Sequence, residues 1–356
     1  MKRHLFLVAV VLMLIGSAAV FADEAVLIDF SLLAADIIQN PAGEGFRENR
    51  ATMMNFADMA GSGYTAEQKA QMAVSLALEN WDVVLASSSR SNDNQSLSYV
   101  RPAPVNESGP AYAANSSVMG VRVRFPLGSF NSWARIQPPF QIPAFEPLAT
   151  VGDDGTIEPT EGSTATGLTR FEGAVDEESS LLTAFGIVKN VGVLKSVAVR
   201  VRGLNFPHGL HAVLIDQDGN ENVVFMGYLS FDGWRTLRWD NPQYINDVRN
   251  RELRVIPLYP RSNPFVRFGG FLITRDAANE GGDFVAYFKD VKILYDKAVL
   301  DPVRDIDDES IWGIINDRET DRQRVEGERF GAAQVLRHLE AQKQEPRTGE
   351  EWTTEE

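Results

Sequence analysis

Two histidines three residues apart are the first groups in this chain that could do chemistry. The sequence contains four histidines and no cysteine, which rules out thiolate metal sites and cysteine nucleophiles. His208 and His211 lie between Pro207 and an apolar run, whereas zinc-binding histidine pairs usually share one face of a helix. A metal site would need a further ligand at a matching position, and none is compelling. We therefore expect no metal and no cofactor, and interpret both histidines as polar residues where a loop meets a strand.

Carboxylates are abundant, but their spacing does not specify catalysis. Asp216, Asp218 and Asn220 resemble the start of a calcium loop, yet Gly227 stands where the closing Glu would be needed. Turn chemistry favours a hairpin turn instead. The 49 Asp and Glu residues do not single out a pair for glycoside hydrolysis. The chain also lacks a G-x-S-x-G motif, a P-loop and a dinucleotide fingerprint, so we expect that it is not an enzyme.

Arginines form the clearest polar pattern. In two runs, 118–125 and 193–204, arginines alternate with valines, and a period of two is typical of a half-buried strand. The arginines of each run therefore share the face that points away from the core, where crowded guanidinium groups favour acidic partners. We predict contact with the chain's own acidic tail or with an acidic surface of a neighbouring subunit, the alternative being a merely solvated face. The candidate contact residues are Arg122, Arg124, Arg200 and Arg202.

Tryptophans offer a second kind of surface. Exposed rings on a sheet could stack on sugars, but each of four tryptophans lies inside a strand-like pattern. Packing in the core or at its rim is the favoured interpretation for Trp81, Trp133, Trp234 and Trp239.

The elements that position these residues are mostly strands. Strand patterns recur about every 10 to 15 residues with turn signals between them, and crossover helices are absent. This spacing favours a mainly β fold, an antiparallel β-sandwich that is jelly-roll-like and similar to carbohydrate-binding-module sandwiches, with a few short helices. One helix is expected over 65–78, with Thr65 as its N-cap. Strands are expected at 25–30, 81–86, 118–125, 132–136, 193–204, 210–215, 223–229, 253–258, 266–274 and 284–295.

The stretch 227–244 is unusually rich in aromatic residues. It predicts two strands joined by a tight turn at Asp232 and Gly233, because glycine adopts positive φ at little steric cost. Such aromatic loading around a turn is typical of the rim of a sheet, where large rings bury area and fix register.

The first 22 residues are typical of a secretory signal peptide. Two basic residues precede an apolar run, 5–15, that is too short to span a bilayer, and a small-residue cleavage site follows. We predict cleavage between Ala22 and Asp23 and export of the mature chain. The net charge of −15 would then become −17, which makes nucleic acid and anionic membranes poor partners.

The mature chain divides into two parts. Residues 23–300 are expected to form the sandwich domain, with long polar loops at 87–112 and 149–180. Residues 301–356 form an acidic tail with 16 Asp and Glu against 8 Lys and Arg. An amphipathic helix is expected within 325–339 and disorder after Gln344.

Several runs of residues resemble the flagellar filament outer layer (FlaA) family of spirochaetes. They are spread over most of the mature chain, up to about residue 300, and the acidic tail supports the likeness less. The matching runs are N-R-A-T-M-M (49–54), N-W-D-V-V-L-A-S-S-S-R (80–90), M-G-V-R-V-R-F-P (119–126), N-S-W-A-R-I-Q-P-P-F (131–140) and G-Y-L-S-F-D-G-W-R-T-L-R-W-D-N-P-Q-Y (227–244).

This resemblance implies a structural role in the periplasm. Such proteins coat a core filament of flagellin-like subunits beside neighbouring copies or paralogues, and the coat affects filament stiffness and motility. The matched residues carry no implied catalytic or ligand-binding role. From the residues alone, an exported β protein without a catalytic motif is most often a binding or assembly module, and a periplasmic carbohydrate-binding module is the alternative.

Overall fold

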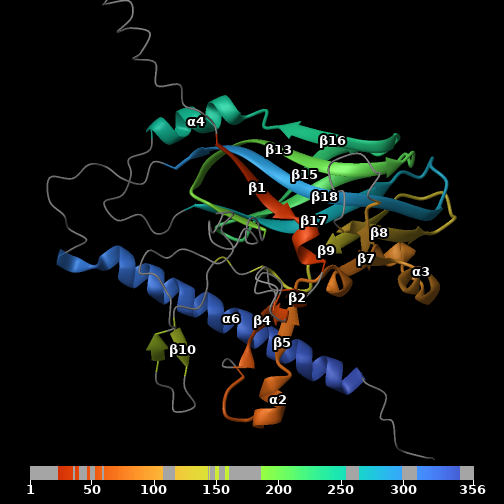
Figure 1. Ribbon diagram of the computed structural model, residues 1–356. Helices are drawn as coiled ribbons and strands as arrows, with labels where there is room; N and C mark the ends of the chain where they lie inside the picture. Colours follow the sequence, from red (N-terminus) through yellow and green to blue (C-terminus); the bar gives the residue numbers. More distant parts are fainter. Residues whose placement is uncertain are drawn as a thin grey trace, which may run out of the picture.

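Alternating apolar and charged residues fold into two antiparallel sheets that pack face to face (Figure 1). The computed structural model describes a large part of the chain, and the predicted β-sandwich is confirmed. Residues 1–22, where the signal peptide is predicted, and residues 345–356, where disorder is predicted, lie outside the described part. The described residues are 23–34, 37–39, 46–48, 53–57, 60–106, 117–142, 144, 149–151, 157–159, 186–253, 264–298 and 311–344.

Sheet 1 carries the arginines singled out above. Its strand order is β16 (Asp232–Asp240), β13 (Val191–Leu204), β18 (Gly282–Lys297), β8 (Ser117–Phe125) and β7 (Tyr99–Pro104), and β1 (Asp23–Asp29) also pairs with β18.

Sheet 2 forms the other layer. Its strand order is β15 (Glu221–Tyr228), β14 (Gly209–Asp216), β17 (Phe265–Arg275), β9 (Ser132–Gln137) and β6 (Asp82–Leu85), and β12 (Ile187–Lys189) pairs with the start of β17.

Smaller elements surround the two layers. Three short hairpins pair β2 (Ile37–Gln39) with β3 (Phe46–Glu48), β4 (Met53–Asn55) with β5 (Ala73–Ser75), and β10 (Ala149–Val151) with β11 (Ile157–Pro159). The helices are η1 (Phe30–Leu33), α2 (Ala66–Ala70), η3 (Leu78–Asn80), η4 (Ser87–Ser89), α3 (Asn92–Ser96), α4 (Tyr244–Leu253) and α6 (Ile314–Gln344).

The core lies between the sheets and fixes which side chains face outward. In β8 and β13 the valines and the phenylalanine of the alternating runs are almost completely buried, as the period of two predicts. Stacked rings join the layers, because Phe288 of sheet 1 lies 4.4 Å, centroid to centroid, from Phe271 of sheet 2. A one-residue slip of either arginine-bearing strand would bury its guanidinium groups, so burial specifies the register.

The sandwich has two ends that later sections distinguish. At the 204–209 end, β13 leaves sheet 1 and β14 begins sheet 2. Buried Arg275 closes this end by donating hydrogen bonds to the carbonyl oxygens of Pro126, Gly128 and Phe130 in the β8–β9 loop. The 216–221 end carries the β14–β15 turn and the start of β17.

The predicted hairpin at Asp232 and Gly233 is wrong. These residues begin β16 and pair with Leu204 and Gly203 of β13, while the preceding strand, β15, belongs to sheet 2. The chain therefore crosses from one layer to the other between the two strands. Leu229 and Phe231 in that crossing are buried in the core, and this burial outweighs the local turn preference.

Three further predictions need correction. The helix expected over 65–78 ends at Ala70, although its Thr65 capping box is present, because Ala73–Ser75 pairs with β4. Within the expected loop 87–112, residues 99–104 form β7, an edge strand that tolerates its prolines because one side is unpaired. The strand expected at 253–258 is not confirmed, because Leu253 is the last residue of helix α4 and 254–263 lie outside the described residues.

Helix α4 starts where the Asn241 side chain accepts a hydrogen bond from the backbone N–H of Gln243.

The C-terminal helix α6 is longer than the 325–339 stretch predicted and packs beside the sandwich (Figure 1). Phe330 lies edge-on to Phe140, with ring centroids 5.2 Å apart. Arg267 at the start of β17 is buried, and its Nη1 donates to Glu326 Oε1 at 2.9 Å. These contacts anchor α6 at the 216–221 end. No helix in the described ranges combines the length and apolarity needed to cross a bilayer.

We predict that Glu326→Gln weakens the attachment of α6. Glutamine keeps an acceptor oxygen but removes the charge that compensates buried Arg267, which should cost about 2 kcal/mol of unfolding free energy. Urea unfolding measures the loss, and hydrogen exchange should be faster in α6 than in the sheets. The control Glu328→Gln is exposed on the same helix and should change stability little. Equal effects of the two substitutions would contradict the proposed anchor.

Candidate functional site

The outward face of sheet 1 gathers arginines that are far apart in the sequence. Strands β7 and β8 on one side of β18, and strands β13 and β16 on its other side, contribute guanidinium groups to it. The chain as a whole has a net charge of −15, so this is a basic surface on an acidic protein. Its arginines are Arg101, Arg122, Arg124, Arg200, Arg202 and Arg238. We call this surface the arginine face.

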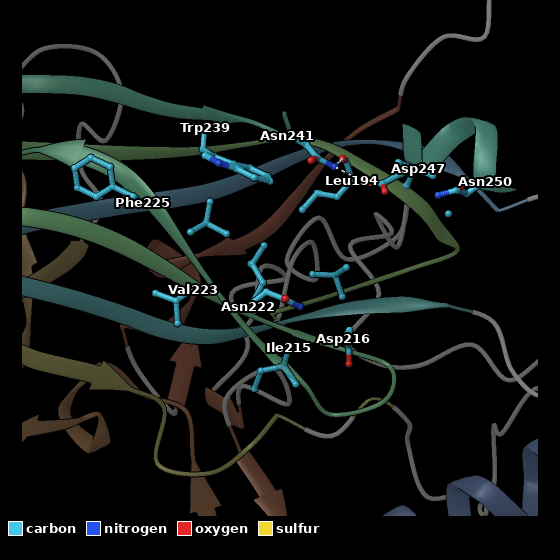
Figure 2. Close-up of a pocket in the computed structure, with 15 residues that line it drawn as sticks. Leu194, Ile215, Asp216, Asn222, Val223, Phe225, Trp239, Asn241, Asp247 and Asn250 are labelled. Atoms are coloured by element: carbon cyan, nitrogen blue, oxygen red, sulfur yellow. Dashed lines mark hydrogen bonds between the residues drawn. The ribbon is translucent and has the colours of Figure 1, made fainter. Parts of the chain in front are cut away.

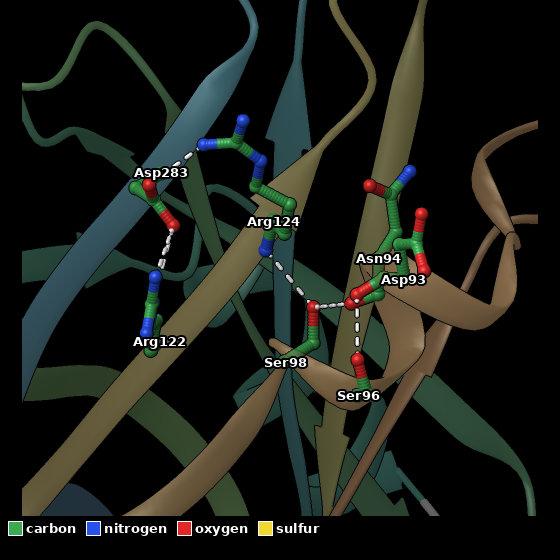
Figure 3. A network of polar contacts seen from close by, with 7 residues as sticks. All are labelled: Asp93, Asn94, Ser96, Ser98, Arg122, Arg124 and Asp283. Carbon is green, nitrogen blue, oxygen red and sulfur yellow. Dashed lines mark hydrogen bonds and ion pairs between the residues drawn. The ribbon is translucent and has the colours of Figure 1, made fainter.

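Asp283 of β18 holds two of these arginines in place (Figure 3). Arg122 Nη2 donates to its Oδ1 at 2.9 Å, and Arg124 Nη1 donates to its Oδ2 at 2.6 Å. The hydrogen bond from Arg122 is the main cause that lowers the pKa of Asp283 below its ordinary value. Ser98 orients the strand from the other side, because its Oγ accepts from the backbone N–H of Arg124 and donates to Asn94 O.

The acidic partner of Arg122 and Arg124 was predicted to lie in the tail or on another subunit. In the structure, Asp283 within the sandwich is one acidic partner of both arginines. One carboxylate shared by two guanidinium groups leaves a net positive charge at this site. Both arginines and Asp283 are about one-third to two-fifths exposed, so they remain accessible to a further anionic group. Their role in partner contact stays a prediction.

Arg202 lies between two aromatic residues in one row of the sheet. It is directly opposite Trp234 on β16 and Tyr287 on β18. These residues line a recess of about 360 Å³ together with Ala103 and Asn106 near the end of β7. Arg202 is exposed, and within the described ranges no carboxylate forms an ion pair with it. The recess therefore combines a cation with two apolar walls. We call it the Arg202 recess.

A glycine packs against two residues that line this recess. Gly120 on β8 lies opposite Tyr287, and an added Cβ would stand 3.3 Å from Ala103 Cβ and 3.5 Å from Tyr287 Cδ1. A side chain at this position would therefore crowd the Tyr287 ring and the end of β7.

The outward face of sheet 2 has a different character. Tyr228 and Trp133 occupy the two ends of one row across four strands, with Gly209 and Thr274 between them. Their side chains are 53% and 41% exposed, unlike Trp81, which is in the core as expected. Trp133 is thus on the surface, not in the core. Exposed aromatic residues grouped on one face are typical of an interaction surface.

A cleft of about 670 Å³ opens between the edge strands β15 and β16, beside α4 (Figure 2). Trp239 of β16 and Phe225 of β15 line it, and Asn241, Asp247 and Asp216 supply polar groups. All three of these polar residues are engaged in local structure. Asp216 accepts hydrogen bonds from Asp218 N and Asn220 N in the predicted hairpin turn, which is confirmed.

Asp247 of the same cleft accepts a hydrogen bond from Asn241 Nδ2 at 3.1 Å. The carboxylates around the cleft therefore stabilise a turn and a helix start.

The two histidines occupy different environments, one in the core and one on the surface of sheet 2. His208 is 3% exposed and packs against Phe125 and Phe284, each with ring centroids 4.9 Å away. Burial, reinforced by the positive charge of Arg275, lowers its pKa to about 4. His211 is on the outward face of sheet 2 beside Phe225. No group of three or more metal-ligating side chains is found among the described residues.

Comparison with known proteins agrees with the sequence pattern. The model of the flagellar filament outer layer protein FlaA family matches residues 45–304. The flagellar filament outer layer protein of Treponema pallidum is 52% identical over 344 residues, covering 96% of this chain and 94% of its own. That of Spirochaeta aurantia is 44% identical, covering 96% and 93%.

A carbohydrate-binding module of the β-sandwich superfamily is similar at 8% identity and a TM-score of 0.27, covering 60% of this chain and 56% of that one. A likeness at this level does not support a conclusion about function. Fold and surface define a two-layer antiparallel sandwich with one basic and one aromatic face. The family match and the two relatives show that the chain belongs to the flagellar filament outer layer protein family.

We predict that His208 makes the fold sensitive to mild acid. Its folded pKa of about 4 lies below the ordinary 6.5, so the unfolded chain binds more protons in that interval and stability falls as the pH drops through it. This linkage should remove about 2 kcal/mol of unfolding free energy between pH 7 and pH 5. Urea unfolding of the native chain and of His208→Phe at both pH values isolates the contribution.

The same measurement on His338→Gln, a substitution in α6, is the comparison for loss of a histidine elsewhere in the chain. If His208→Phe loses as much stability as the native chain between the two pH values, the assignment to His208 is wrong.

Proposed function

We propose that this protein is a structural, non-enzymatic subunit of the outer layer of a periplasmic flagellar filament. It coats a core of flagellin-like subunits and contributes to filament stiffness and so to motility. The observation that supports this most is the family match, which extends over nearly the full length of relatives named for that layer. The predicted signal peptide, with cleavage between Ala22 and Asp23, agrees with export to the periplasm.

The arginine face supports a role in assembly. An outer-layer subunit must bind the core, its neighbours or both, although an acidic chain repels further copies of itself. A basic face gives such a chain an attractive surface for acidic partners and orients it during encounter. The pair Arg122 and Arg124, held by Asp283 across adjacent strands, presents a fixed geometry for this purpose. We assign the partner contacts of the layer to this face.

Carbohydrate binding is the second candidate. It is favoured by the exposed Trp133 and Tyr228 in one row of sheet 2, since aromatic faces exposed on a sheet suit the CH groups of sugars. The two functions would use opposite faces of the sandwich, which makes them separable by experiment.

We predict that the arginine pair is needed for binding to filaments. The mature chain, 23–356, is co-sedimented with periplasmic filament cores stripped of their outer layer, with and without free glycans as competitors. Arg122→Gln combined with Arg124→Gln should raise the half-saturating concentration at least about tenfold, because two fixed cations are lost. Glutamine is chosen because glutamate at both positions would crowd three carboxylates together, Asp283 included.

The matched control is Arg90→Gln combined with Arg249→Gln, two exposed arginines that are not on a strand of the face, and it should bind like the native chain. Saturable binding that sugars do not affect supports the outer-layer role. Native binding by the Arg122 and Arg124 variant would contradict the assignment of the face. Binding abolished by one glycan would favour the second candidate.

A further inference from the structure

The Arg202 recess has a shape and charge that select a particular kind of ligand. Its guanidinium group favours a carboxylate, and the walls formed by Trp234 and Tyr287 favour a large apolar or aromatic group. A volume of about 360 Å³ accommodates a side chain as large as an indole. The fitting ligand is therefore an acidic peptide segment that carries an aromatic residue. The remaining arginines of the face lie on the same side of sheet 1.

This chain itself contains one segment of that composition. Residues 345–356 read E-P-R-T-G-E-E-W-T-T-E-E, with five glutamates, one arginine and one tryptophan. Trp352 is flanked by glutamates on both sides, at 350–351 and 355–356. The segment thus offers an aromatic anchor within a run of negative charge, which complements the recess in both respects.

The arrangement of the sandwich favours a segment from another copy. Helix α6, after which the segment follows, is anchored by Glu326 at the 216–221 end and on sheet 2. The recess opens on sheet 1, and Arg202 lies two residues before the end of β13, toward the 204–209 end. Helix α6 continues from Glu326 to Gln344 on the side of sheet 2, so a chain's own segment would have to pass around the sandwich to the opposite layer.

We propose that the Arg202 recess binds the acidic segment 345–356 of a second copy of this chain, with Trp352 between Trp234 and Tyr287 and a glutamate on Arg202. Such a contact is heterologous, because the two copies use different surfaces. Repeated, it links subunits head to tail, as a continuous layer requires. The inference rests on the proposed assembly role, yet it concerns the contact between copies and can be tested without filaments.

Complementation between two variants tests this contact directly. Arg202→Glu has a disabled recess and an intact segment, whereas a chain ending at Gln344 has an intact recess and lacks the segment. Sedimentation equilibrium should show that the native chain self-associates with increasing concentration and that each variant alone stays monomeric. Mixed, the two variants should form a one-to-one dimer, because each supplies what the other lacks. Higher salt should weaken the association.

The control Arg249→Glu makes the same change in net charge on exposed α4 and should self-associate like the native chain. A fluorescent peptide of residues 345–356 should bind the chain that ends at Gln344, and Arg202→Glu in that chain should weaken binding at least about tenfold. Trp234→Ala should weaken it as well. Circular dichroism verifies that each variant is folded.

Two results would overturn the proposal. In the first, the native chain stays monomeric and the peptide binds only the chain that ends at Gln344. The segment of the native chain would then occupy the recess of the same molecule. The other is peptide binding or self-association unaffected by Arg202→Glu. Filament binding is measured separately, so failure of this contact and failure of the outer-layer role can be told apart.

Discussion

Burial of the apolar side of sheet 1 is the constraint on which the surface of this protein depends. Val197, Val199 and Val201 are fully buried, and the alternation of the strand then forces Arg200 and Arg202 to the opposite side. Removing each valine from water is worth about 1.5 to 3 kcal/mol, while burying an unpaired guanidinium group would cost several kcal/mol. The core thus decides where the charges lie, and the arginine face follows from the packing.

The two layers leave two faces of different chemistry. On sheet 1, guanidinium groups surround Trp234 and Tyr287, whereas sheet 2 presents Trp133 and Tyr228 with few charges between them. A subunit in a layer needs at least two distinct contact surfaces, since a single one would close after a pair has formed. Helix α6 adds a third element at the 216–221 end, held by Arg267 and Phe330.

Much of the fold could be predicted because strands of the sandwich have recognisable apolar patterns. The runs in β8 and β13 alternate over most of their length, β14 is a nearly continuous apolar run, and the structure confirms all three as strands. The errors arise where tertiary contacts override local preference. Asp232 and Gly233 have turn chemistry, but buried Leu229 and Phe231 direct the chain across the core.

The candidate site was predictable only in part. Alternation alone placed Arg122 and Arg124 on the outward face. Their carboxylate partner, Asp283, is 161 and 159 residues away in the sequence, and only strand pairing brings it near. The same holds for Trp234 and Tyr287 beside Arg202, which come from strands on either side of β13. A sequence pattern reports which face a residue occupies, whereas its neighbours across the sheet depend on strand order.

The central claim is that the arginine face is covered when the subunit is in its layer. The chain has no cysteine, so a single cysteine can report the exposure of each face. We would introduce Thr236→Cys on the outward side of β16, or Val223→Cys on the outward side of β15, and measure maleimide reactivity in free subunits and in isolated filaments. The account predicts that assembly slows labelling of Thr236→Cys at least about tenfold, the effect of burial under a partner, and leaves Val223→Cys reactive. Equal labelling of Thr236→Cys in both states, with Val223→Cys protected, would contradict it.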